Sequence, residues 1–205
     1  MHERIRLYVV LDPSACVLPP VEVAHAVLSG GATALQLRMK SQSDRAILDL
    51  AVKLREIVKT YGGTFIVNDR IDLALASKAD GVHLGVDDLP LGAAAEIGGP
   101  SFILGYSPET DGEAARAKLH GASYLGVGPV FGTSSKLDAG PALGLNLFAQ
   151  RVSICDLPVA GIGGITAANA RSIVDAGASG VAVMSSVLRT TDPAAATRAI
   201  AAALR

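Results

Sequence analysis

Hydrophobic residues occur in this chain as short uninterrupted runs, and each run is followed by a turn and a longer stretch with helical spacing. An uninterrupted run, unlike an alternating one, is typical of a strand that is covered on both faces. The runs are rich in Val, Leu, Ile, Ala and Gly, which suits buried strands. We predict strands at 5–11, 33–38, 64–68, 81–85, 101–105, 123–128, 157–163 and 179–185.

The stretches between these runs repeat Ala and Leu at helical intervals, at 20–29, 43–60, 70–78, 90–97, 109–119, 144–152, 167–176 and 193–204. Strands that alternate with helices are parallel, because parallel neighbours need a crossover connection. Right-handed crossovers repeated around the sheet close it into a barrel. We therefore predict a single α/β domain, a (β/α)8 TIM barrel over residues 1–205, with an open doubly wound sheet as the alternative.

Composition narrows the class of partner. The 205 residues are 50% hydrophobic and 18% charged, with a formal net charge of −1, so no surface for nucleic acid or anionic membrane is expected. No apolar run nears the roughly 20 residues of a membrane span, and the first run is too short for a signal segment. Small-molecule substrates are the partners that remain.

The two cysteines, Cys16 and Cys155, lie far apart and have no metal-binding spacing, which favours free thiols over a disulfide or a zinc site. Free thiols are typical of a reducing compartment, and we predict a cytoplasmic protein. A homo-oligomer is compatible with the sequence, which carries no information on oligomeric state.

On this fold the active site lies where strands end and βα loops begin. Alternation along the second strand sends Gln36, Arg38 and Lys40 to one side, which for the first two is the barrel interior near its top. A buried cation needs an anion. An arginine fork with a lysine point charge suits a phosphate, and an ion pair with an acidic neighbour is the structural alternative.

Carboxylates follow the next two strands. Asn68 and Asp69 end the third strand, and Asp87 and Asp88 follow the fourth. Magnesium in proteins is typically held by one or two carboxylates together with substrate phosphates and water. Beside the cations of the second strand, Asp69 and Asp88 are predicted to hold Mg²⁺. Capping of the following helix is the alternative for each aspartate.

Two further polar residues are ambiguous from sequence. His83 lies inside the fourth strand, where a hydrogen-bonded core residue and a catalytic group are equally consistent with the pattern. Ser107 follows the fifth strand, and its hydroxyl suits either donation to a phosphate or capping of the next helix. Both alternatives stay open at this stage.

The longest loop, 128–141, follows the sixth strand and carries Thr133, Ser134, Ser135 and Lys136 among glycines. That density of donors suits a lid that closes on an anion, and a passive surface loop is the alternative. After the seventh and eighth strands come Gly163-Gly164 and 184–186, Met-Ser-Ser. Those two loops often bind phosphate through backbone N–H groups on barrels of this kind.

The residues thus predict two anion sites, a cationic one assisted by a metal and a neutral one built from backbone and hydroxyl groups. The first suits a pyrophosphate and the second a monophosphate. No Cys/His pair or Ser/His/Asp triad for covalent catalysis is evident in the sequence. The simplest reaction is the joining of two phosphorylated small molecules with loss of pyrophosphate.

The sequence resembles the thiamin phosphate synthase family over essentially its whole length. The shared segments are QLRMK, NDRIDLA, GVHLGVDD, YLGVGPVFGTSSK, GIGGIT and GVAVMSS. The resemblance implies an Mg²⁺-dependent transferase that joins 4-amino-2-methyl-5-hydroxymethylpyrimidine diphosphate to thiazole phosphate. The products are thiamin phosphate and pyrophosphate, and the mechanism is dissociative.

The resemblance also implies roles for individual residues. Asp69 and Asp88 are expected to ligate Mg²⁺, and Arg38, Ser107 and Lys136 to carry the chemical step. The pyrimidine diphosphate is expected to contact Gln36, Arg38, Lys40, Asn68, Ser107 and Lys136. The thiazole phosphate is expected to contact Thr133, Ser134, Ser135, Gly164, Met184 and Ser185.

The chain departs from the family pattern at three places. Val86 stands where the family usually has Gln, Pro108-Glu109 where a polar residue such as His is common, and Ser135 where a second Thr is common. A thiazole tautomerase of the same family is the nearest alternative, but it is expected to lose the QxRxK and NDR elements. A non-catalytic phosphate-binding homologue and an unrelated barrel enzyme such as an epimerase are further alternatives.

Overall fold

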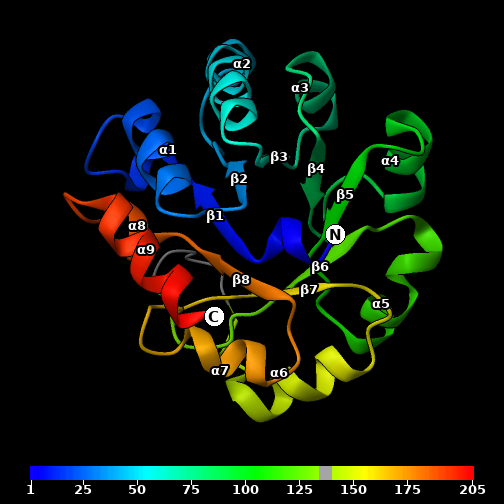
Figure 1. The fold of residues 1–205 in the computed structure, drawn as a ribbon. Coiled ribbons are helices and arrows are strands. Elements are labelled where there is room, and N and C mark those ends of the chain that lie inside the picture. The colour runs from blue at the N-terminus through cyan, green and yellow to red at the C-terminus, as the bar shows by residue number, and fades with distance from the viewer. Residues whose placement is uncertain (134–139) are drawn as a thin grey trace.

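In the computed structural model, which describes residues 1–133 and 140–205, eight parallel strands close into a barrel in the order β1 to β8. The barrel closes where β8 pairs with β1, with Val181 opposite Leu7. The predicted (β/α)8 fold is therefore confirmed (Figure 1). The strands are β1 Leu7–Leu11, β2 Ala34–Leu37, β3 Thr64–Asn68, β4 Gly81–Leu84, β5 Ile103–Tyr106, β6 Tyr124–Val127, β7 Val159–Ile162 and β8 Gly180–Val183.

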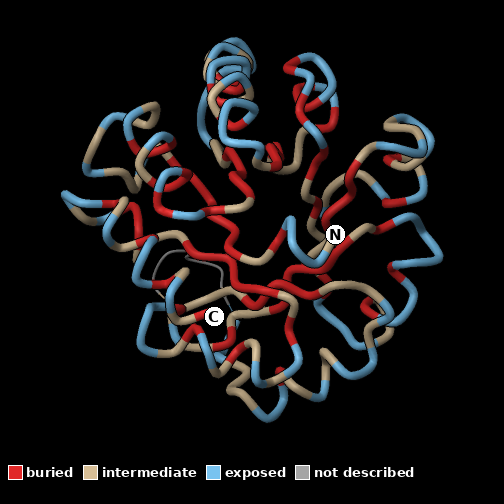
Figure 2. Tube along the Cα trace, in the orientation of Figure 1, coloured by how far each residue is buried: buried red, intermediate tan, exposed pale blue. Residues whose placement is uncertain are grey.

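Helices surround the barrel, and their buried faces point inward while their outer faces are exposed (Figure 2). Local sequence explains several helix starts, because Ser43 caps α2 and Thr110 with Glu113 forms a capping box at α5. The helices are α1 Pro20–Ser29, α2 Asp44–Thr60, α3 Ile71–Ala76, α4 Leu91–Gly98, α5 Asp111–Arg116, α6 Gly144–Ser153, α7 Ala170–Asp175, α8 Ser185–Leu188 and α9 Pro193–Ala203. Short 3-10 helices occupy Glu3–Ile5, Pro13–Ala15 and Ala117–His120.

Two hydrophobic clusters hold this arrangement. The larger one lies between the strands and the helices, where outward-facing strand residues such as Leu35 and Val181 are fully buried. The smaller one fills the barrel interior, in keeping with a packed core rather than a pore. Its buried members are Ile5, Tyr8, Ala34, Ile66, Ile103, Tyr124, Ala160 and Ala182.

The interior becomes polar toward the C-terminal ends of the strands. Two residues beyond Ala34 and Ile66 on the same inward face are Gln36 and Asn68. Asn68 is the register partner of His83 across β3 and β4. An apolar layer therefore supports a polar layer directly above it, at the end of the barrel where enzymes of this fold bind substrate.

Among the described residues, no helix is both long and apolar enough to cross a membrane.

Candidate functional site at the C-terminal rim of the barrel

Arg38 is held by an ion pair that the sequence left open as an alternative. Its Nη1 lies 2.6 Å from Oδ2 of Asp12, and both side chains are largely buried. Asp12 also accepts hydrogen bonds from the N–H and the hydroxyl of Ser14, so its orientation is fixed. Sequence reasoning did not single out Asp12. Its place directly after the strand ending at Leu11 was the available signal, because that is a rim position.

The amide pair Gln36 and Asn68 forms the floor of this part of the rim. Gln36 is 4% exposed, and its Nε2 donates to Asn68 Oδ1 at 2.6 Å. The pair spans β2 and β3, and each amide orients the other. The remaining N–H and C=O groups of the two amides are the ones that can face a bound molecule.

Asp69 lies beside Lys40 and Asp88. Lys40 Nζ is 3.9 Å from Asp69 Oδ2, and the carboxyl group of Asp88 lies close enough to raise the pKa of Asp69. Asp69 has a φ of 62°, a left-handed conformation that is uncommon outside glycine and recurs at functional sites. The structure thus brings Lys40, Asp69 and Asp88 together at one end of the barrel.

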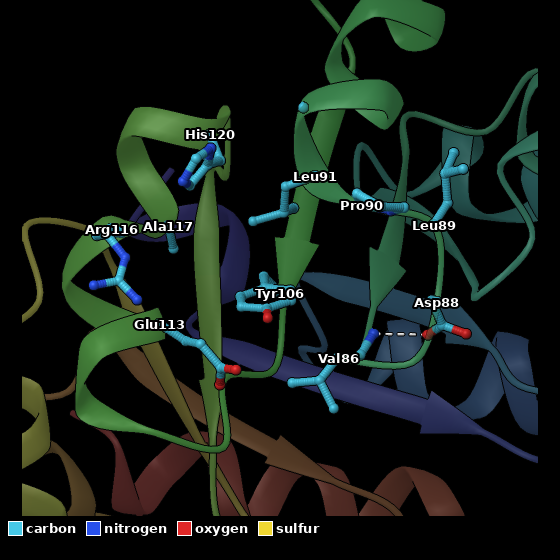
Figure 3. A pocket seen from close by; sticks show the side chains of 12 residues that line it. Val86, Asp88, Leu89, Pro90, Leu91, Tyr106, Glu113, Arg116, Ala117 and His120 are labelled. Atoms are coloured by element: carbon cyan, nitrogen blue, oxygen red, sulfur yellow. Dashed lines mark hydrogen bonds between the residues drawn. The ribbon is translucent and has the colours of Figure 1, made fainter.

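Neither aspartate caps a helix. The residue that precedes α3 is Arg70, which makes no side-chain cap, and α4 follows Pro90. Asp88 instead accepts a hydrogen bond from the Gly85 N–H at 2.7 Å within its own loop (Figure 3). The capping alternative for Asp69 and Asp88 is therefore wrong.

The negative charge of the aspartate pair is only partly compensated by the nearby cations Lys40 and Arg38. The pKa of Asp69 is raised from its ordinary value of 3.8 to about 6. Burial is the largest cause and the negative charge of Asp88 adds to it, whereas Lys40 and Arg38 lower the pKa. A cation placed between the two carboxylates would relieve this repulsion.

Ser107 does not cap α5, whose cap is Thr110. Its Oγ lies 2.8 Å from His83 Nε2, and His83 Nδ1 lies 3.0 Å from the hydroxyl of Tyr124. Burial lowers the pKa of His83 to about 4, so its imidazole is neutral at physiological pH. His83 is thus a partly buried residue whose ring nitrogens both lie within hydrogen-bond distance of a hydroxyl, one of them that of the predicted site residue Ser107.

The loops after β6 and β7 pack against each other. Phe131 N–H donates to Gly163 O at 3.1 Å. Gly164 has a φ of 64°, and a Cβ there would lie 2.6 Å from Gly132 O. Only glycine fits this contact, because both the backbone conformation and the available space exclude a side chain.

The residues after β8 complete that side of the rim. Met184 precedes α8, a helix of four residues that begins at Ser185. Ser186 Oγ is buried and has no hydrogen-bond partner among the described residues. Thr133 is described, whereas Ser134, Ser135 and Lys136 lie outside the described residues.

The rim therefore has two parts. We define the charged half as Asp12, Arg38, Lys40, Asp69 and Asp88, which follow β1 to β4. The neutral half comprises the described loops 128–133, 163–166 and 184–186, which follow β6 to β8 and contain no charged residue. Among the described residues, no group of three or more His, Cys, Asp or Glu side chains is arranged to hold a metal.

A cavity of about 310 Å³ opens beside the charged half, between α4 and α5 (Figure 3). It reaches the rim at Val86 and Asp88, and its far wall includes Glu113 and Arg116. Val86 places an apolar side chain where the related family usually has an amide. A second departure, Glu109, is exposed, and its backbone N–H donates a hydrogen bond to Glu113 Oε2.

The closed barrel and its polar C-terminal rim define the class of this protein as a TIM barrel, a fold whose enzymes have their active sites in the βα loops. A family model described as thiamine monophosphate synthase matches residues 7–187. The chain belongs to that family, and the transferase activity of thiamine biosynthesis is assigned to it on the same grounds.

Named relatives agree with this assignment. The chain is 51% identical over 180 residues to a thiamine-phosphate synthase from Roseiflexus castenholzii, covering 88% of this chain and 79% of the relative. It is 48% identical over 181 residues to a thiamine-phosphate synthase from Moorella thermoacetica, covering 88% of this chain and 86% of the relative. The solved structure of a thiamine phosphate pyrophosphorylase from Pyrococcus furiosus superposes on this structure with a TM-score of 0.90 at 37% sequence identity. The match covers 99% of this chain and 96% of the other. Neither the tautomerase nor the non-catalytic alternative is favoured by these matches.

Proposed function

We propose that the protein carries out thiamine-phosphate synthesis with Mg²⁺ bound at Asp69 and Asp88, and that the charged half of the rim stabilises the departing pyrophosphate. The observation that carries the proposal is the convergence of two cations and two carboxylates from β2, β3 and β4 at one end of the barrel. The substrates would be the pyrimidine diphosphate and the thiazole phosphate that the family resemblance implies.

The residues fit a magnesium ion. Two adjacent carboxylates supply the number of protein ligands that Mg²⁺ commonly uses when substrate phosphates and water complete its shell. The pKa of Asp69 is raised by burial and by the charge of Asp88 despite the nearby cations Lys40 and Arg38, so the pair has negative charge left for a further cation. When bound, Mg²⁺ would supply positive charge to the pyrophosphate oxygens.

The side chains of the charged half would divide the remaining work. Lys40 is half-exposed and can reach a diphosphate as a point charge. Arg38 already shares its charge with Asp12, so the donors of its fork that Asp12 does not use would bind the phosphate. Ser107 would donate to the leaving group. Lys136, outside the described residues, would close over the same group.

The chemical step is a substitution at the methylene carbon of the pyrimidine. The bond from that carbon to the diphosphate oxygen breaks, and its electron pair leaves with pyrophosphate. The resulting pyrimidinyl-methyl cation is captured by the thiazole nitrogen, whose lone pair forms the new C–N bond. The protein contributes alignment of the two substrates and stabilisation of the developing negative charge, without a covalent intermediate. Gln36 and Asn68 would orient the pyrimidine diphosphate from below.

The neutral half would hold the thiazole phosphate. Gly164 lets backbone approach the ligand without a Cβ, and Met184 and Ser185 supply the turn into α8. The hydroxyl groups of Thr133, Ser134 and Ser135 would add donors from the loop after β6. The buried hydroxyl of Ser186, without a partner among the described residues, adds a donor that the sequence interpretation did not assign.

The direct test is to mix purified protein with both substrates and Mg²⁺ and to measure thiamin phosphate and pyrophosphate. Equal amounts of the two products are expected, with no product when either substrate is omitted. Chelator should stop the reaction and excess Mg²⁺ should restore it. Product formation that persists in chelator would remove the metal from the proposal while leaving the transferase activity standing.

A further inference from the structure

A chain of hydrogen bonds runs from the barrel interior up to Ser107. Tyr8 and Tyr124 hydroxyl oxygens are 2.8 Å apart, and Tyr124 continues to His83 Nδ1 at 3.0 Å. His83 Nε2 then reaches Ser107 Oγ at 2.8 Å. The four residues come from β1, β6, β4 and the end of β5, so the chain crosses the interior of the barrel.

The backbone of two strands leaves room for this chain. A Cβ on Gly105 of β5 would lie 2.3 Å from the Tyr124 hydroxyl and 2.4 Å from His83 Nδ1. A Cβ on Gly126 of β6 would lie 3.2 Å from Ser107 Oγ. Any side chain at Gly105 would displace the tyrosine or the imidazole, so the arrangement depends on glycine there.

Tyr8, at the interior end of this series of hydrogen bonds, determines which group donates and which accepts at each step. Tyr8 is 2% exposed, sits among apolar residues, and has one hydrogen-bond partner among the described residues, Tyr124. If Tyr8 accepted from Tyr124, its own O–H would be buried without an acceptor among the described residues, which is unfavourable. Tyr8 therefore donates to Tyr124, and Tyr124 donates to His83 Nδ1.

The imidazole of His83 links the donor–acceptor order at Tyr124 to that at Ser107. A neutral imidazole has one N–H donor and one acceptor nitrogen. Because Nδ1 accepts from Tyr124, the proton lies on Nε2 and is donated to Ser107 Oγ. The hydroxyl hydrogen of Ser107 is then free of His83 and can be donated to another group.

We propose that His83, oriented by Tyr124 and Tyr8, is a positioning residue that makes Ser107 a hydrogen-bond donor toward the bound anion. This rests on the proposed contact between Ser107 and the departing pyrophosphate. If Ser107 instead donated its hydroxyl hydrogen to His83 Nε2, only its oxygen lone pairs would face the negatively charged group. Donation to developing negative charge is favourable, whereas a lone pair facing it is repulsive.

The first test reads the position of the proton and needs no substrate. ¹⁵N NMR of the protein labelled at histidine distinguishes a protonated ring nitrogen from an unprotonated one, and the His83→Gln variant assigns the signals. At neutral pH the Nε2–H form of His83 is expected. Observation of the Nδ1–H form, or of an imidazolium, would overturn the proposal whatever the activity of the protein.

The second test separates positioning from a structural role. His83→Phe is expected to lower kcat about tenfold, the size of one hydrogen bond, with little change in KM for the pyrimidine diphosphate. In His83→Gln the side-chain amide can donate near the place of Nε2, so this variant should recover most of the loss. His25→Gln, at an exposed histidine of α1, is the matched control and should behave as wild type.

The double-mutant cycle decides whether His83 acts through Ser107. Ser107→Ala should lower kcat by itself, and adding His83→Phe to it should cost nothing more. Additive losses would mean that His83 contacts the substrate or supports the fold, and would refute the proposal. Melting temperatures of all variants identify any loss that comes from unfolding.

Discussion

The two halves of the rim, which in the proposed function each bind a phosphate, are built by different means. The charged half uses paired groups: Arg38 with Asp12, and Lys40 with Asp69, which in turn faces Asp88. The neutral half uses no charge and relies on glycine backbone and hydroxyl groups, as at Gly164. Both lie at the same end of one barrel, so the difference cannot come from the fold.

The fate of each phosphate explains the contrast. A departing pyrophosphate gains negative charge in the transition state, and only interactions that strengthen there accelerate the reaction. A phosphate that stays on the product does not change its charge during the step. In the proposed function, neutral donors therefore hold it. In the proposed function, charged side chains thus lie where negative charge develops on the substrate during the reaction.

The sharpest way to break the comparison is to neutralise the carboxylates of the charged half. Asp69→Asn combined with Asp88→Asn should lower the Mg²⁺-dependent rate by about a thousandfold or more, because several kcal/mol of charge stabilisation is lost. Product formation at saturating Mg²⁺ is the measurement. Asp175→Asn, an exposed aspartate paired with Arg171 on α7, is the control and should leave the rate unchanged.

Lys136 should matter less than the carboxylates. Lys136→Ala is expected to lower turnover at least tenfold and to leave the melting temperature unchanged, because one contact to the leaving group disappears. Lys118→Ala, at a lysine of the 3-10 helix Ala117–His120, serves as the control. Turnover equal to wild type at saturating substrate would take Lys136 out of the mechanism.

A substitution in the neutral half should affect only one substrate. In Gly164→Ala the new Cβ meets Gly132 O and the left-handed φ is strained, at about 1 kcal/mol or more. We expect KM for the thiazole phosphate to rise about fivefold and KM for the pyrimidine diphosphate to stay constant. Gly112→Ala on α5, where a Cβ makes ordinary contacts, is the control. Equal changes in both constants would show that the two halves are not independent sites.

The sequence predicted the repeating units of the fold well, for a local reason. The strands are short and largely apolar runs, and α1 and β3 begin and end at the predicted residues. Prediction was weaker where an element is short or changes type. The segment at 109–119 is α5 followed by a 3-10 helix, and α8 has only four residues, too few to show helical periodicity.

Side-chain partners were less predictable than the elements. Rim residues were found because strand ends can be located in sequence, but pairing depends on register between strands. Asp12 is 26 residues from Arg38, and His83 is 24 residues from Ser107. Local patterns carry no information on such contacts. Hence the partners of Arg38 and His83 are seen only in three dimensions.

The smallest expected effect concerns stability without Mg²⁺. The pKa of Asp69 is raised to about 6 in the folded protein, so the folded state holds this proton more tightly than the unfolded chain. Stability from this group is complete below the unfolded pKa of about 4 and is lost as pH rises through about 6. The free energy of unfolding of wild type relative to Asp69→Asn should therefore fall between these pH values and stay flat above them. Urea titrations of both proteins in chelator measure the difference.

The sign of this pH dependence tests whether the charge of Asp69 and Asp88 is uncompensated before a cation binds. A difference that rises with pH would mean that Lys40 and Arg38 already compensate Asp69, and the pair with Asp88 would need no cation. If the difference falls as expected, Mg²⁺ with pyrophosphate should restore the stability of wild type at neutral pH and leave Asp69→Asn unaffected. The neutral half contains no ionisable group whose charge must be compensated, so Gly164→Ala should show no such dependence on pH or metal.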